Sequence, residues 1–238
     1  MLVKTNAIVL SVIKYGESSL IARLLTENYG LRSYMLKGVR SPGKKKIRPG
    51  YFQPFTQLEV VASHKDKGSL ETLREVRLAH HYQSLQTDIV KSSLVMFLAE
   101  VVQYGVQETD DDPDLYDFII RAADWLDENE DMASFHIVFM LHLTRFLGFY
   151  PDFSNEGAPV FDLVEGELVE NTLNPSASGD LLDILSSLME AGFENMSSVR
   201  MNRGQRVRML NMLVEYYQIH LHGFRKPKSL DILQSVFH

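Results

Sequence analysis

Residues 4–40, KTNAIVLSVIKYGESSLIARLLTENYGLRSYMLKGVR, contain three short runs in which apolar side chains alternate with polar or mixed ones. Alternation with a period of two is typical of β-strands that bury one face. The runs lie at residues 8–12, 20–26 and 31–39, and the segments between them contain Gly16 and Gly30 in turn-forming triplets. The stretch therefore predicts three consecutive β-strands.

Two more runs of the same kind follow at residues 55–62 and 73–78. Five strands within about eighty residues are too few for a β-sandwich and suit a small closed barrel. The OB-fold is the commonest barrel with this strand count. We therefore predict an OB-fold in residues 1–80.

From Tyr82 onward the spacing of apolar residues becomes helical. We expect helices at residues 88–107, 113–125, 132–149, 180–191 and 197–222, and an irregular β-insert at 150–176 with a hairpin at 161–169. The predicted fold class is therefore α+β and multi-domain. It comprises the barrel and a mostly helical domain at residues 81–238.

The charge of the chain is divided unevenly between these two parts. Residues 1–80 carry fourteen Lys and Arg against six Asp and Glu, whereas the remainder carries ten against twenty-five. The net charge of −7 thus conceals a basic part of +8 and an acidic part of −15. Because local potential depends on how charge is distributed, the basic part remains a candidate for binding nucleic acid.

Signatures of enzymes and metal sites are missing from the sequence. It contains no cysteine, no P-loop, no dinucleotide-binding glycine motif and no metalloprotease or hydrolase signature. Its eight histidines are scattered, and the acids at 110–112 and 114 are typical of a helix start. No apolar run is long enough for a signal peptide or a membrane span. We expect a soluble cytoplasmic protein with no enzyme activity, metal, cofactor or membrane partner.

The loop at residues 37–50 carries six cations and no acid. Cations neutralise phosphates, and aromatic rings on a barrel face stack on unpaired bases, so this combination favours binding of single strands. The alternative is a solvated basic loop beside ordinary core aromatics such as Tyr51, Phe52 and Phe55. The predicted DNA-binding residues are Arg32, Tyr34, Lys37, Arg40, Lys44, Lys45, Lys46 and Arg48.

These elements, in this order, resemble the RecO family of bacterial recombination mediators. The opening stretch quoted above resembles that family's first barrel strands and the basic turn after them. PGYFQPFTQLEVV at 49–61 resembles its fourth strand, and QRVRMLNMLVEYYQIHLHGFRKPKSLDIL at 205–233 resembles its last helix and tail. The resemblance is one of pattern and order, without a sharp catalytic motif.

The resemblance implies a protein of the RecF pathway of DNA repair that acts at the bacterial nucleoid. It implies binding of single- and double-stranded DNA, strand annealing, and partnership with RecR and with the acidic tail of single-stranded DNA-binding protein. It also implies a role in helping RecA to replace that protein on single strands. Many family members carry a four-cysteine zinc module, but residues 151–175 contain no cysteine. We therefore expect no bound zinc, and a hairpin held by Val160, Phe161, Leu163, Leu168 and Val169.

The chemistry of the acidic tail of single-stranded DNA-binding protein restricts which residues of this chain could bind it. The tail ends in an apolar residue that bears the chain carboxylate, so its receptor needs an apolar pocket rimmed by cations. The candidates are Arg121, Arg145, Arg200, Arg203, Arg206 and Arg208, of which the last four form a dense group that we favour. Arg203 and Arg206 are three residues apart and share one helix face, from which Arg208 is turned away.

Two alternatives stay open at this point. The arginines of the dense group could pair internally with acids such as Glu190 and Glu194. The whole chain could also be an adaptor whose acidic helical domain binds proteins while the barrel serves as a scaffold. The salt dependence of oligonucleotide binding distinguishes the adaptor from a DNA-binding protein.

Overall fold

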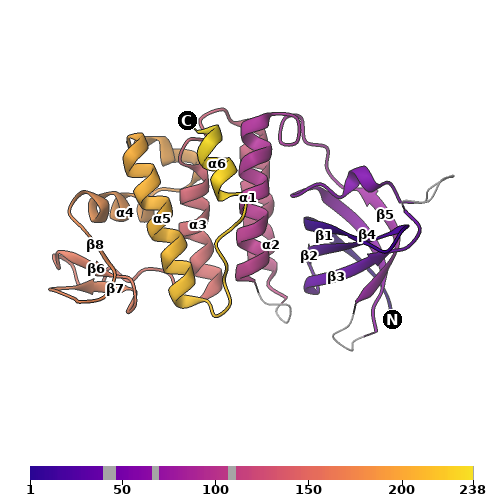
Figure 1. Ribbon diagram of the computed structural model, residues 1–238, viewed down its shortest axis with the longest axis horizontal. Helices are drawn as coiled ribbons and strands as arrows, with labels where there is room; N and C mark the ends of the chain where they lie inside the picture. The colour runs from indigo at the N-terminus through magenta and orange to yellow at the C-terminus, as the bar shows by residue number, and fades with distance from the viewer. Residues whose placement is uncertain (40–46, 66–69, 107–110, 238) are drawn as a thin grey trace. The chain divides into compact units, whose positions relative to one another are not determined.

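The structure is a computed structural model that describes residues 1–39, 47–65, 70–106 and 111–237. The chain divides into two compact units, Met1–Asp127 and Glu128–His238. The first unit contains a five-stranded barrel and two helices, and the second contains further helices and a small sheet (Figure 1). The predicted barrel, helical region and small β-insert are thereby confirmed. The boundary expected between residues 80 and 81 stays a prediction.

The barrel is a closed sheet with the strand order β1-β2-β3-β5-β4. Its strands are β1 (Leu2–Tyr15), β2 (Ser19–Thr26), β3 (Gly30–Leu36), β4 (Gln57–Ser63) and β5 (Glu71–Leu78). Neighbouring strands are antiparallel except for β3 and β5, which run parallel. This five-stranded arrangement is the OB-like barrel that the alternating pattern predicted.

Strand β1 is fourteen residues long and extends well beyond the predicted run at 8–12. Its first half pairs with β4 and its second half with β2, so that Ala7 and Ile8 pair with both strands. Residues 7–10 are all buried, because alternate side chains fill the barrel core while Ile8 and Leu10 are buried on its outer side. The ends of β1 were missed because they reverse the usual pattern: the polar Thr5 is buried, whereas the apolar Ile13 and Tyr15 are exposed.

Strand β4 begins at Gln57, two residues later than predicted. Phe55 is fully buried, and its backbone adopts a positive φ of 61°, which is unusual for a residue with a side chain. Its N–H donates to the carbonyl of Val9 at 2.7 Å. This turn therefore attaches the entry of β4 to the middle of β1.

A carboxylate fastens the segment before helix α1 (Ile89–Gly105) to the end of helix α2 (Pro113–Glu128). The side chain of Asp127 accepts the backbone N–H groups of Gln83, Ser84 and Leu85 at 2.7 to 2.9 Å. The buried Lys91 ammonium donates to Ser84 Oγ and to the Asp127 carbonyl, both at 2.8 Å. Burial alone would raise the pKa of Asp127, but the hydrogen bonds lower it overall.

The second unit contains α3 (Phe135–Leu147), α4 (Asp180–Glu190), the 3-10 helix η2 (Phe193–Ser198), α5 (Arg203–His220) and α6 (Leu230–Val236). Helix α5 begins at Arg203 and not at 197 as predicted, because the Asn202 side chain caps it by accepting the N–H of Gln205. Helix α6 was not predicted, since seven residues are too few to reveal a helical period.

The insert is a three-stranded sheet of β6 (Val160–Asp162), β7 (Glu167–Val169) and β8 (Ser176–Ser178), in the order β7-β6-β8. The predicted hairpin corresponds to β6 and β7. Phe161, Leu163 and Leu168 are buried in it as expected, whereas Val160 and Val169 are only partly covered. Apolar contacts therefore supply one part of what holds this small sheet together.

The other part is the buried carboxylate of Asp162, which the sequence analysis missed. Its Oδ1 accepts the N–H groups of Val164 and Glu165, and its Oδ2 accepts from the Thr172 hydroxyl and the Asn174 amide, all at 2.5 to 3.1 Å. Burial opposes its ionisation, but these hydrogen bonds bring the pKa below its ordinary value. One side chain thus ties together the turn after β6 and the segment after β7.

Contacts with the C-terminal part of α5 hold the insert in place. His220 Nε2 lies 2.8 Å from the Leu163 carbonyl, and the Tyr216 hydroxyl donates to the Phe149 carbonyl at 2.9 Å. Gly166 has a positive φ of 74°, and a Cβ there would lie 2.8 Å from the Tyr216 hydroxyl oxygen. Only glycine fits this position, so the tip of the hairpin lies directly against the helix.

Replacing Asp162 by Ala should destabilise the protein by about 2 kcal/mol, because four partly buried hydrogen bonds lose their charged acceptor. Urea unfolding measures this change in the free energy of unfolding. The exposed Glu170 provides a matched control, since Glu170→Ala removes a carboxylate of the same insert that is in contact with water. Equal free energies of unfolding for the two variants would show that the Asp162 hydrogen bonds stabilise the protein no more than an exposed carboxylate does.

Candidate functional site

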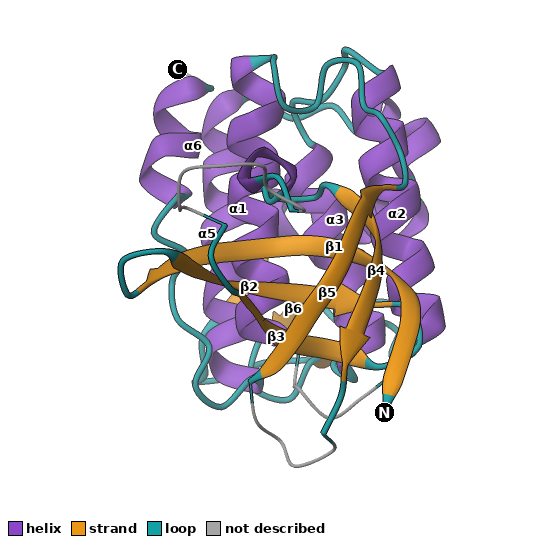
Figure 2. Cartoon of the chain, turned by 90° about the vertical axis from the view of Figure 1, so that its right-hand side faces the viewer, coloured by secondary structure: helices purple, strands orange, loops and turns teal. Residues whose placement is uncertain are grey.

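The β1–β2 hairpin presents an open apolar face to solvent. Ile13 pairs with Ile21, and Ile21 pairs with Met35, so three apolar side chains form a row across β1, β2 and β3. Ile13 is 60% exposed and Tyr15, two residues further on the same side, is 51% exposed. Figure 2 shows that the hairpin extends beyond the other strands of the barrel. Apolar surface of this kind on a sheet face is a binding feature.

Cations border this row. On β2, Arg23 lies two residues after Ile21 and therefore on the same face. It pairs with Ser11 of β1 and with Ser33 of β3. Lys14 and Lys37 are exposed at the hairpin end, where Lys37 directly follows Leu36, the partner of Leu20. The acid Glu17 in the turn adds one negative charge. The face therefore combines exposed apolar side chains with a predominantly positive border.

Three of the predicted DNA-binding cations lie among the residues that the structure describes. Lys37 and Arg48 are exposed, and the Arg48 guanidinium carbon lies 5.8 Å from the centre of the Tyr51 ring. Arg32 is half-buried and donates from Nε to the Tyr29 carbonyl at 2.8 Å. Lys37 is thus beside the apolar row, while Arg32 is partly engaged within the barrel. Arg40, Lys44, Lys45 and Lys46 lie outside the described residues.

The expectation that Tyr34 contacts a base is wrong for this structure. Its side chain is fully buried in the barrel core, and a hydrogen bond of 2.9 Å joins its hydroxyl to His64 Nε2. The pKa of the Tyr34 hydroxyl is raised above its ordinary value, mainly because the group is buried. Phe52 and Phe55 are also buried. Among the described residues of the barrel strands, Tyr15 has an exposed aromatic ring, and its position before the Gly16 turn was the available signal.

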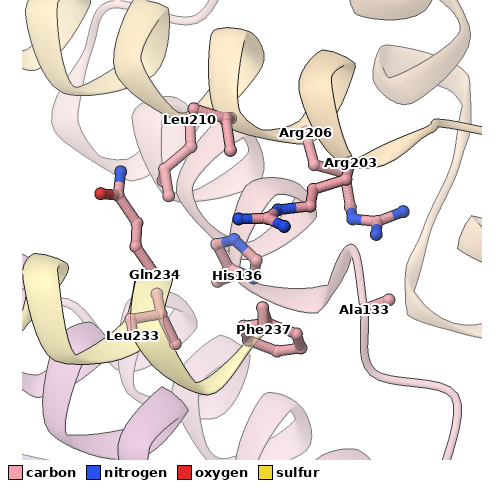
Figure 3. Close-up of a pocket in the computed structure, with 9 residues that line it drawn as sticks. Ala133, His136, Arg203, Arg206, Leu210, Leu233, Gln234 and Phe237 are labelled. Atoms are coloured by element: carbon pink, nitrogen blue, oxygen red, sulfur yellow. The ribbon is translucent and has the colours of Figure 1, made fainter.

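The second unit contains an apolar pocket with a basic rim. Figure 3 shows most of its lining side chains, which come from α5, from α6 and from the start of α3. The lining residues are Ala133, His136, Arg203, Arg206, Val207, Leu210, Leu233, Gln234 and Phe237. Arg203 and Arg206 supply the two positive charges of this set, and it contains no acid.

His136 forms the floor of the pocket. It is almost fully buried, and its ring stacks on that of Phe237 with 5.5 Å between the centres and 26° between the planes. Figure 3 shows it between Phe237 and Arg206. Burial, aided by the nearby charge of Arg206, lowers the pKa of His136 to about 3. The imidazole is therefore neutral at physiological pH, and Arg203 and Arg206 carry the positive charge of the pocket.

The other arginines of the dense group lie elsewhere. The prediction that Arg203 and Arg206 share a face that turns away from Arg208 is confirmed, because only the first two line the pocket. The Arg208 guanidinium binds both carboxylate oxygens of Asp180, at the start of α4. Arg200 precedes α5 and lines a separate polar hollow that also contains Asp183 and Glu190. The internal partner of Arg208 is thus Asp180, and not the acids that the sequence suggested.

Arg145 and Arg121 are not among the residues that line this pocket. The Arg145 guanidinium carbon lies 4.2 Å from the centre of the Tyr150 ring, and Nη2 donates to the Tyr150 hydroxyl at 2.8 Å. Arg121 is exposed on α2, in the first unit. The structure therefore brings together two of the six predicted partner-binding residues.

The residues that the structure describes contain no group of three or more His, Asp or Glu side chains placed to hold a metal ion. Within the same residues, no helix combines the length and hydropathy that a bilayer crossing requires.

Comparison with known proteins gives matches along almost the whole chain. Residues 1–82 match the family model described as Recombination protein O N terminal, and residues 86–231 match Recombination protein O C terminal. Similar relatives, each named DNA repair protein RecO, come from Christiangramia forsetii (40% identical over 238 residues), Flavobacterium johnsoniae (39% over 237) and Bacteroides fragilis (33% over 246). Each alignment covers 100% of both chains.

The buried His136 should make the stability of the protein depend on pH. Its pKa of about 3 in the folded state lies below the unfolded value of 6.5, so the unfolded chain binds a proton that the folded chain does not. The stabilisation is complete above the unfolded pKa and declines as the pH falls towards 3. Between about pH 7 and pH 5 the loss should be about 2 kcal/mol. Urea unfolding of wild type and His136→Phe measures it, and parallel curves would contradict the assignment.

Proposed function

The chain belongs to the RecO family of DNA repair proteins, and on that premise we propose that it is a DNA-binding protein of recombinational repair without a catalytic step. It binds single- and double-stranded DNA through its barrel and promotes strand annealing. With RecR it helps to load RecA onto strands that are covered by single-stranded DNA-binding protein. Its place of action is the bacterial nucleoid.

The open face of the β1–β2 hairpin carries this proposal. Tyr15 offers an exposed aromatic ring, and Ile13 and Met35 extend the apolar surface beside it. Bases stack on such side chains regardless of sequence, while the neighbouring cations neutralise phosphates. This open face is exposed to solvent along the end of β1, after the buried residues 7–10.

This arrangement favours single strands over duplexes. A duplex hides the faces of its bases in the stack, so an exposed apolar row gains contact only from bases that are unpaired. The cations, in contrast, contact phosphate in both kinds of DNA. Lys37 and Arg48, together with Arg40, Lys44, Lys45 and Lys46 of the undescribed segment, supply this second contribution. The protein therefore binds both forms, with an additional gain for single strands.

The pocket between α5 and α6 supports the second part of the proposal, the binding of the acidic tail of single-stranded DNA-binding protein. Such a tail presents an apolar residue that bears a carboxylate, and the pocket offers apolar walls beside Arg203 and Arg206. Guanidinium groups bind carboxylates through charge-assisted hydrogen bonds. The same pocket would suit a protein adaptor without DNA-binding activity, and DNA titration separates the two functions.

Two substitutions should separate stacking from charge neutralisation in the barrel. Tyr15→Ala should weaken binding of a single-stranded oligonucleotide by about fivefold or more and leave the salt dependence unchanged, because a ring releases no counterions. Lys37→Ala should lower the slope of log affinity against log salt by about 0.7. Fluorescence anisotropy at several salt concentrations measures both quantities.

The control for these variants is Lys4→Ala. Lys4 lies eleven residues before Tyr15 on β1 and forms an ion pair with Glu59 at 3.2 Å, so its loss removes an equal charge far from the open face. Its affinity and slope should stay close to those of wild type. If the Lys4 and Lys37 variants behave alike, the proposed face is wrong and binding reflects only total charge.

For the pocket, we expect the double substitution of Arg203 and Arg206 by Ala to weaken binding of an acidic peptide that ends in Phe by about tenfold. Arg145→Ala removes an exposed arginine of the same unit that does not line the pocket, and it should leave peptide affinity unchanged. Isothermal titration and thermal melting are measured on each variant. An intact affinity with a lowered melting temperature in the double variant would mean that these arginines serve the fold.

A further inference from the structure

The pocket beside Arg203 and Arg206 already holds an aromatic ring of the chain itself. Phe237 follows α6 directly, and its ring lies against His136 on the pocket floor (Figure 3). The space that remains unfilled is about 30 Å³, which suffices for about two water molecules. A second aromatic side chain therefore cannot enter while Phe237 stays in place.

The segment that carries Phe237 is held weakly at its last turn. Helix α6 has seven residues, and helices of this length are not stable without tertiary contacts. Leu230 and Leu233 are buried and anchor its first turns. Beyond Leu233, Phe237 is only partly covered, and on the outer side of the helix Ile232 is 50% exposed. The last turn can thus separate from the pocket while the buried leucines keep the rest of the helix attached.

Phe237 also has the chemistry of the ligand that the pocket suits. It stacks an apolar ring on the neutral imidazole of His136, in a pocket that Arg203 and Arg206 also line. We propose that Phe237 is an internal occupant of this pocket, and that an acidic peptide with an apolar terminal residue binds by displacing it. The proposal rests on the proposed peptide-binding function, and it adds a competition within the chain.

Competition of this kind lowers the apparent affinity for the peptide. When only a fraction of molecules has an open pocket, the measured dissociation constant is the intrinsic constant divided by that fraction. The pocket therefore favours a ligand at high local concentration over a dilute one. If Phe237 is an internal occupant, its removal should raise the affinity for the peptide. If Phe237 is part of the pocket wall, its removal should lower that affinity.

The test uses the full chain and a synthetic acidic peptide that ends in Phe with a free carboxylate. Phe237→Ala should bind this peptide about three to ten times more tightly than wild type. Ile232→Ala shortens an exposed side chain of the same helix and should leave the affinity unchanged. Affinity that is equal or weaker in Phe237→Ala overturns the displacement, since Phe237 then is a wall or a bystander. No binding by wild type or by Phe237→Ala overturns the peptide site itself, and the displacement with it.

A second measurement reports the position of the ring and does not depend on the gain in affinity. The chain has one tryptophan, Trp125, so Phe237→Trp combined with Trp125→Phe places the single tryptophan in the pocket, where it can be excited selectively over the tyrosines. Addition of the peptide should shift its emission to longer wavelength, because the indole moves from the pocket into water. An unchanged or blue-shifted emission at saturating peptide would show that the ring stays in place, and the proposal would then be wrong.

Discussion

Strand β1 is the element on which the barrel depends, because it pairs with β4 through its first half and with β2 through its second. At Ala7 and Ile8 it is hydrogen-bonded on both edges, and a bulge between Val9 and Ser11 lets it change direction there. The same strand is buried on both faces at its centre and exposed at its end. The exposed end is the open face with Ile13 and Tyr15, so the strand that closes the barrel also carries the face that we propose binds DNA.

The segregation of charge gives each unit a different binding chemistry. The barrel lies in the basic part of the chain, where cations exceed acids and surround the open apolar face. The second unit lies in the acidic part, where most arginines have partners inside the unit, as Arg208 has in Asp180 and Arg145 in Tyr150. Arg203 and Arg206 line an apolar pocket whose lining contains no acid, and Arg206 also donates to the Met201 carbonyl at 2.6 Å. A polyanion thus suits the first unit, and a short acidic segment suits the second.

The sequence predicted those helices and strands well that bury one face and expose the other to solvent. Strands β2 and β3 and helix α4 have this pattern, and their observed limits lie close to the predicted ones. It failed where burial depends on distant segments. The β1 strand was predicted too short because its ends break the expected pattern, with the polar Thr5 buried and the apolar Ile13 and Tyr15 exposed. Tyr34 was placed on the surface because nothing local shows that its hydroxyl is hydrogen-bonded to His64. Asp162 was overlooked because two of its four donors, Thr172 and Asn174, come close to it only after the insert folds.

The two candidate sites differ in what a ligand must displace. On the barrel face, a base covers side chains that are in contact with water, so binding gains apolar burial without breaking a protein contact. In the pocket, the apolar surface is already covered by Phe237, so a ligand gains only the difference between its own contacts and those of that ring. In the proposed complex, the carboxylate of the acidic peptide supplies this difference, because Phe237 brings no negative side chain to Arg203 and Arg206. Such a pocket would select for charge, although its walls are mostly apolar.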